Sequence, residues 1–235
     1  MAGDHSSGRL AAPRRRLANE ERLVALGQRI DQRTEEHERD PRVRRAILGV
    51  EGNARLTSSL AAVIFVLLAI EGVTIVLIHN LFNAHVFVGL LLIPPILAKI
   101  SSTGWRFAKY YSGSPAYRKK GPPLMFLRLL GPLVVVLTLI VLASGVALIA
   151  LPTSFRATLF FVHRASFVLW IGVTSLHVLG HLGETIRLAP RDWLARTRRQ
   201  VTGATARQWV VVWAVAAGLI SAVLVTPLGY GWFTR

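Results

Sequence analysis

Long apolar stretches alternate with short basic segments along most of the chain, after a polar beginning. A helix needs about 20 mainly apolar residues to cross the hydrocarbon core of a bilayer. Five stretches meet this requirement, and they run over Thr57–Ile78, Phe82–Ser101, Leu124–Leu151, Ala157–Leu182 and Trp209–Leu228. The pattern predicts an all-α, polytopic membrane protein with five transmembrane helices, the first four of which form a bundle.

The composition supports this prediction. Apolar residues make up 52% of the chain and charged residues only 17%, whereas soluble domains carry about 25% charged residues. An ordinary soluble domain and a disordered chain are therefore both disfavoured. The chain has no cysteine, which excludes disulfides, iron–sulfur clusters and thiol catalysis and leaves histidine as the main metal ligand.

Basic residues are divided unevenly among the connections between the spans. Residues 99–128 carry seven Lys or Arg and no acid, and residues 184–207 carry six with two acids. The other two connections, 79–81 and 152–156, carry a single Arg. Since cytoplasmic loops are enriched in Lys and Arg, we expect these two basic connections to be cytoplasmic. The protein would then lie in the cytoplasmic membrane with its N-terminus inside and its C-terminus outside. The net charge of +16 then reflects topology and contacts with anionic lipid, not nucleic-acid binding.

This reading divides the chain into four parts. Residues 1–56 form a polar, basic cytoplasmic arm, which is either a surface helix on the inner leaflet or a partly disordered tail. Residues 57–182 form the four-helix bundle, and residues 183–207 form a basic cytoplasmic loop. Residues 208–235 form the fifth helix and a short outer tail.

Four histidines lie within the predicted spans: His85, His163, His177 and His181. Ionisable residues at membrane depth are costly and usually serve a function. At 1.5 Å per residue, His85 lies about 4–6 Å and His163 about 9–12 Å from the outer ends of their spans. The two can meet in the outer half of the bundle, where two imidazoles from facing helices can clamp a haem iron.

Small residues and cations lie near this pair. Gly89 and Gly145 leave gaps that either accommodate a flat macrocycle or allow close helix packing. Arg156 and Arg164 are the available outer partners for haem propionates, although Arg164 points about 100° away from the neighbouring His163.

A second pattern links the two halves of the fourth span. His163 and His177 are 14 residues apart, which places them on one helix face and about 21 Å apart along the axis. Such a face could hold two stacked haems. Trp170 lies halfway between them, either between two cofactors or as part of an ordinary bundle core.

Two stretches carry a family resemblance: HVFVGLLLIPPILAKISSTGWRFAKYYSGSPAYRKKGPP, which begins at His85, and HRASFVLWIGVTSLHVLGH, which begins at His163. These stretches resemble actinobacterial proteins of the cytochrome b/b6 type. The histidines on the second and fourth spans, with the 14-residue spacing on the fourth, resemble membrane b-type cytochromes: the bacterial cytochrome b561 family and, more distantly, the cytochrome b of the quinol-oxidising complexes. The resemblance covers residues 57–182. It implies haem b, with His85 and His163 as axial ligands of the iron, and electron exchange between membrane quinol and a redox partner.

The chain departs from that family at the inner position. The family's inner haem takes a ligand from another helix, but Lys99, not histidine, stands 14 residues after His85. Three interpretations remain: one haem only, a second haem with a ligand such as Lys99, or a ligand from another subunit. We favour one haem. His177 and His181 then serve a quinone site or a proton relay, or are solvated by headgroups. A zinc site would need Glu184 as a third ligand.

Glu71 is the only acid within a predicted span. It is either a proton carrier for quinol oxidation near the outer haem or a hydrogen-bonded packing group.

The sequence therefore predicts a membrane-embedded b-type cytochrome, the electron-transfer subunit of an oxidoreductase. Its partners are expected to be lipid, quinone and an extracytoplasmic redox subunit; the resemblance suggests a molybdenum-type oxidoreductase. Two alternatives remain open: a haem-free scaffold or assembly subunit, and a small proton-coupled transporter.

Overall fold

The computed structural model describes residues 47–121, 125–194 and 202–232, together with the single residues 22, 24 and 196. The chain divides into two units, residues 1–45 and residues 46–235. In the first unit only Arg22 and Val24 are described, and both are helical. The predicted polar arm therefore lies outside the described residues, apart from Arg22, Val24 and its last ten positions.

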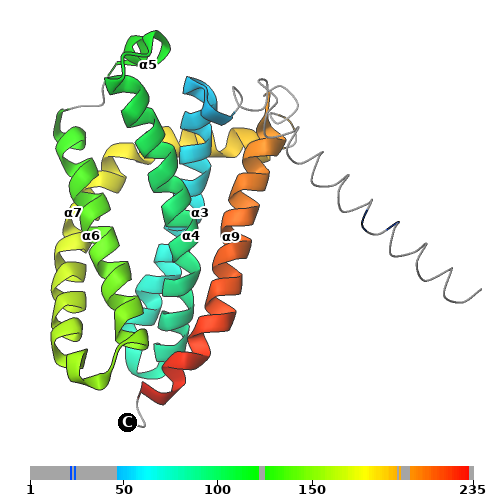
Figure 1. The fold of residues 1–235 in the computed structure, drawn as a ribbon. Coiled ribbons are helices and arrows are strands. Elements are labelled where there is room, and N and C mark those ends of the chain that lie inside the picture. The colour runs from blue at the N-terminus through cyan, green and yellow to red at the C-terminus, as the bar shows by residue number, and fades with distance from the viewer. Residues whose placement is uncertain are drawn as a thin grey trace, which may run out of the picture. The chain divides into compact units, whose positions relative to one another are not determined.

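The second unit is helical throughout its described residues, with no strand (Figure 1). Five of its helices are long and apolar enough to cross a membrane, which confirms the predicted fold class. The elements are α3 (Val50–Val76), α4 (Ile78–Tyr111), α5 (Pro115–Lys120), α6 (Met125–Ala150), η1 (Thr153–Phe155), α7 (Arg156–Trp193), α9 (Ala204–Val225) and η2 (Thr226–Trp232).

Several helices extend beyond the apolar stretches from which they were predicted, among them α3, α4, which continues past Ser101 to Tyr111, and α7. α3 begins at Val50, because the polar Asn53 is buried in its first turns and donates hydrogen bonds to the Ser102 carbonyl oxygen (2.9 Å) and Oγ (3.0 Å). α7 has 38 residues and continues to Trp193, into the segment predicted as a basic loop. Hydropathy marks the part of a helix that lies in the hydrocarbon, not the residue at which the helix ends.

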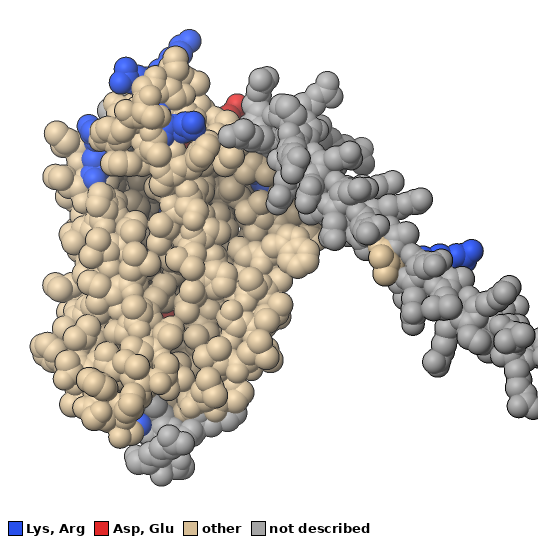
Figure 2. All heavy atoms as spheres, viewed as in Figure 1, with Lys and Arg blue, Asp and Glu red and all other residues tan. Residues whose placement is uncertain are grey.

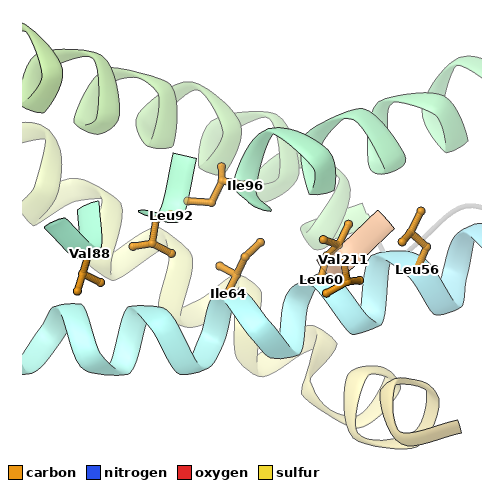
Figure 3. Packing of buried hydrophobic residues seen from close by; sticks show 7 residues of the cluster. All are labelled: Leu56, Leu60, Ile64, Val88, Leu92, Ile96 and Val211. Atoms are coloured by element: carbon orange, nitrogen blue, oxygen red, sulfur yellow. The ribbon is translucent and has the colours of Figure 1, made fainter. Parts of the chain in front are cut away.

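The packing order of the helices determines which of them face each other. α3 packs against both α4 and α7, α6 packs mainly against α7, and α9 packs against α4. Within the described residues α4 and α7 share no extensive contact, so they lie across the bundle from each other. The main core cluster fills the contact of α3 with α4 and α9, and consists of Leu56, Leu60, Ile64, Val88, Leu92, Ile96 and Val211 (Figure 3).

The two ends of this unit differ in polarity. We call them the η1 end and the α5 end, after the short helices found there (Figure 1). Visible Lys and Arg side chains gather mainly at the α5 end, whereas the flanks of the unit are largely uncharged (Figure 2). Apolar flanks and a basic end are typical of a multi-pass membrane protein.

A buried ion pair joins α7 to α9 at the α5 end. Arg207 donates to both carboxylate oxygens of Asp192, at 2.5 and 2.7 Å, and each side chain is only 1% exposed. Gln208 donates to the Asp192 carbonyl oxygen at 2.7 Å. This two-point contact is the strong form of an Arg–carboxylate interaction, and it fixes the beginning of α9.

A short contact at the same end positions α5. The Tyr117 hydroxyl (2.6 Å) and the Trp105 indole nitrogen (3.2 Å) both donate to the Leu48 carbonyl oxygen. Burial raises the pKa of Tyr117, while the Trp105 contact and the charge of Arg106 oppose that rise. The hydroxyl therefore stays a donor at neutral pH, and the aromatic, basic segment after α4 packs on the residues that precede α3.

Candidate functional site

The structure brings His85 of α4 and His163 of α7 together across the bundle. The centres of the two imidazole rings are 6.3 Å apart, and their planes are inclined at 75°. The two parent helices share no extensive contact within the described residues, so the side chains reach across the bundle interior. This is the arrangement that their depths in the sequence predicted.

A carboxylate from α3 holds the His85 ring. Glu71 Oε1 lies 2.9 Å from His85 Nδ1, and the Glu71 residue is only 8% exposed. The Thr74 hydroxyl donates to Glu71 Oε2 at 3.0 Å and to the Glu71 carbonyl oxygen at 2.7 Å. Glu71 is thus the direct partner of a predicted ligand, and Thr74 fixes its position.

Two acceptors from α6 hold the His163 ring. His163 Nδ1 lies 3.1 Å from the Val141 carbonyl oxygen and 3.0 Å from Ser144 Oγ. A carbonyl oxygen only accepts hydrogen bonds, so this contact requires the proton of the neutral ring to be on Nδ1. Both histidines therefore direct Nδ1 at acceptors, and within the described part of the chain each Nε2 is left without a hydrogen bond.

The two predicted glycines lie against these groups. A Cβ atom on Gly145 would lie 3.2 Å from His163 Cε1, and one on Gly89 would lie 3.4 Å from Glu71 Oε1. Glycine therefore makes room for the imidazole ring at one position and for the carboxylate at the other. We expected these glycines either to leave space for a macrocycle or to allow close helix packing. In the structure Gly145 lies against His163, and Gly89 lies against Glu71, the partner of His85.

The ring geometry fits a metal ion between the two histidines. A coordinated imidazole nitrogen lies about 2 Å from its metal, so rings on opposite sides of one ion have centres roughly 6 Å apart. The observed 6.3 Å matches this spacing. Metal-binding histidines also almost always engage their other ring nitrogen with a carboxylate or a backbone carbonyl, as both of these histidines do. Haem iron, which takes two axial nitrogens, suits a site of this kind.

Both predicted propionate partners, Arg156 and Arg164, belong to α7. Arg164 is exposed and lies over the Phe160 ring, with its guanidinium carbon 5.5 Å from the ring centre. Arg156 is the first residue of α7, two turns before His163. The direction of Arg164 follows from its place beside His163 in sequence, since adjacent residues on a helix point about 100° apart.

The other two histidines lie near the α5 end of α7. The rings of His177 and His181 are 4.8 Å apart, and His181 Nδ1 lies 3.8 Å from Glu184 Oε2. His177 Nδ1 is buried and has no hydrogen-bond partner among the described residues. No group of three His, Asp or Glu side chains in the described part of the chain is arranged to hold a metal ion.

Trp170 lies between the two histidine levels of α7 and is tied to α6. Its indole nitrogen donates to Thr138 Oγ1 at 2.8 Å, and its ring stacks on Phe167 with centres 6.1 Å apart. These contacts match the interpretation of Trp170 as part of the bundle core.

Sequence reasoning missed the groups that hold the histidine rings. Ser144 and the Val141 carbonyl carry no sequence signal for this role, because a backbone acceptor has no residue identity. Thr74 follows Glu71 by three residues, a spacing that places both on one helix face. That spacing is the only signal that could have identified it.

Comparisons with protein-family models, with curated proteins and with solved structures find no match.

Proposed function

We propose that the chain is a membrane-embedded b-type cytochrome, with His85 and His163 as the axial ligands of a single haem b. One observation carries this proposal: two histidines from opposite helices have ring centres 6.3 Å apart, and acceptors hold the Nδ1 atom of each. The family resemblance of residues 57–182 adds to it.

Bound haem would supply one-electron transfer, and two filled axial positions disfavour oxygen chemistry. The chain's own residues set the properties of the centre. Glu71 places a carboxylate on His85 Nδ1, which makes the ring a more basic ligand. The Val141 carbonyl fixes the tautomer of His163 and the direction of its Nε2.

The electron donor in this proposal is a membrane quinol, and the acceptor is an extracytoplasmic redox subunit. Oxidation of one quinol releases two electrons and two protons, so two successive transfers to a one-electron acceptor complete it. Glu71, buried beside the histidine pair, is the group that would hold a proton during this process. The basic α5 end faces the cytoplasm in this proposal, which places the pair in the half of the bundle nearer the outer side.

The experiment is a reduced-minus-oxidised absorption spectrum of the full chain, purified in mild detergent after expression with added haem. We expect sharp α and β bands and about one haem per chain, as for a six-coordinate b-type centre. His85→Ala and His163→Ala should each abolish haem binding. His79→Ala is the matched control, because His79 is exposed in the first turn of α4.

Two outcomes would overturn the proposal. A wild-type chain without haem would favour a scaffold or a transporter, in which Glu71 and the histidines serve packing or a proton path. Haem retained by both single variants would show that other residues hold it.

A further inference from the structure

A pocket lies between the first turns of α3 and the last turns of α7, at the α5 end of the unit (Figure 1). Its volume is about 380 Å³, within the range of about 300–1,000 Å³ that is typical of ligand sites. Its charged side chains are Glu51 from α3 and Glu184, Arg187 and Arg191 from α7. None of them belongs to the histidine pair or holds one of its rings, so the pocket is a separate site.

The pocket lies at the depth of lipid headgroups. The apolar stretch of α3 begins at Thr57, and the apolar stretch of α7 ends at Leu182. Measured along each helix at 1.5 Å per residue, Ala54 lies about 5 Å and Arg187 about 8 Å beyond these limits. The headgroup region adds about 5–8 Å to each side of the hydrocarbon core of a bilayer. A phospholipid of the adjoining leaflet therefore presents its headgroup at the level of the pocket.

Two guanidinium groups line the α7 side of the pocket. Arg187 and Arg191 are four residues apart, so they lie on adjacent turns of one helix face. Both are exposed, and within the described residues Arg187 makes neither a hydrogen bond nor an ion pair. A guanidinium group matches the geometry of phosphate oxygens and binds them through paired hydrogen bonds. This side of the pocket is therefore suited to a phosphate group.

Two carboxylates line the same pocket, and they would repel a ligand that carried only negative charge. Glu51 accepts a hydrogen bond from Arg55 at 2.7 Å, and Glu184 Oε2 lies 3.8 Å from His181 Nδ1. A carboxylate has about four acceptor sites, so each can accept further hydrogen bonds beside these contacts. An ammonium group supplies both the donors and the opposite charge. The ligand that fits this lining therefore carries a phosphate and an ammonium close together.

We propose that this pocket binds the phosphoethanolamine headgroup of a membrane phospholipid. The two arginines donate hydrogen bonds to the phosphate oxygens, and the two carboxylates accept hydrogen bonds from the ammonium. The apolar Val50, Ala54 and Leu188 complete the lining and contact the carbon atoms of the ligand. Free phosphoethanolamine offers the same charges, but the depth of the pocket favours the lipid as their source. The site does not depend on haem and is independent of the proposed cytochrome function.

The test is a lipid titration of the full-length protein in detergent, with bound lipid counted by native mass spectrometry. Phosphatidylethanolamine should bind about tenfold more tightly than phosphatidylglycerol or phosphatidylcholine, as expected for hydrogen bonds to charged groups. Phosphatidylglycerol lacks the ammonium, and the quaternary ammonium of phosphatidylcholine has no N–H to donate.

Variants assign the binding to the pocket. Arg187→Gln should weaken phosphatidylethanolamine binding about tenfold, because it removes a charged donor. Arg118→Gln is the matched control, since it removes the same charge at an exposed position of α5 outside the pocket, and it should leave binding unchanged. Glu184→Gln should abolish the preference for ethanolamine over choline. Arg187→Lys keeps the charge and should recover part of the affinity, which separates lost binding from misfolding.

Three results would overturn the proposal. Equal affinity for the three lipids in the wild-type chain would show that the pocket does not distinguish their headgroups. Equal affinity in Arg187→Gln and Arg118→Gln would show that the lipid binds elsewhere. Displacement of the lipid by an equal concentration of free phosphoethanolamine would make a soluble phosphate ester, and not a phospholipid, the ligand.

Discussion

The bundle has two polar levels on α4 and α7: His85 with His163 near the η1 end, and Lys99 with His177 fourteen residues further along each helix. The two levels differ in whether their polar atoms have hydrogen-bond partners. At the level nearer the η1 end, a carboxylate on α3 and acceptors on α6 hold both rings. At the level nearer the α5 end, the buried His177 Nδ1 and Thr174 Oγ1 have no hydrogen-bond partner among the described residues. A histidine whose Nδ1 is hydrogen-bonded keeps a fixed ring orientation with Nε2 available to a metal. A histidine whose Nδ1 has no partner can still form a hydrogen bond there.

The difference originates in the two flanking helices. Fourteen residues from Glu71 toward the α5 end stands Thr57, which is hydrogen-bonded to Ser102 at 2.6 Å. Fourteen residues from Ser144 in the same direction stands the buried Leu130. Neither position provides a free acceptor for His177. The residues on α3 and α6, and not the histidines alone, therefore distinguish the levels.

The strongest way to break the comparison is to remove one α7 histidine at a time. His163→Ala should abolish haem binding, because it removes one ligand of the first level. His177→Ala should keep about one haem per chain, since haem iron needs only two axial nitrogens and the first pair supplies both. Haem per chain, measured on the purified protein, checks both variants. Loss of haem in a folded His177→Ala variant would show that the levels form one site.

A smaller effect is expected from Glu71→Gln, which keeps a hydrogen bond to His85 and removes the charge. Partners of this kind are worth about 10–100-fold in metal affinity, so haem should dissociate more readily. The midpoint potential should rise by roughly 60 mV, equivalent to about 1.4 kcal/mol for one electron, because the oxidised iron loses a neighbouring negative charge. Redox titration measures this.

Glu51→Gln, at the other end of α3, is the matched control for this experiment. Glu51 pairs with Arg55 at 2.7 Å and lies far from the histidines along the helix. An unchanged potential in Glu71→Gln would mean that the carboxyl is already neutral beside His85.

The smallest effect should come from the two glycines. A Cβ atom on Gly145 would meet His163 Cε1 at 3.2 Å, closer than ordinary contact, so Gly145→Ala should turn or shift the ring slightly. Gly89→Ala would meet Glu71 Oε1 at 3.4 Å, an ordinary contact, and should change nothing. Low-temperature electron paramagnetic resonance of the oxidised chain reports the angle between axial ligand planes. Equal spectra for both variants would show that the His163 ring accommodates the added methyl group without turning.

Hydropathy was sufficient to predict the five spans and the helical class, because the bilayer imposes length and composition on any helix that crosses it. Residue depth was sufficient to place His85 opposite His163. The role of Ser144 was not predictable, since a hydrogen bond depends on how far each helix is rotated about its axis. The helix ends at Val50 and Trp193 were also missed, because polar packing and not hydropathy determines them.

The Asp192–Arg207 pair bears on whether the first four helices are a self-sufficient unit. The chain could appear to be a four-helix redox module with an optional fifth helix. Yet the carboxylate that ends α7 is buried, and its guanidinium partner begins α9. A chain without α9 would leave the Asp192 carboxylate without its guanidinium partner, and removing one partner of a buried ion pair typically costs about 3–5 kcal/mol. The last span therefore contributes to the stability of the other four.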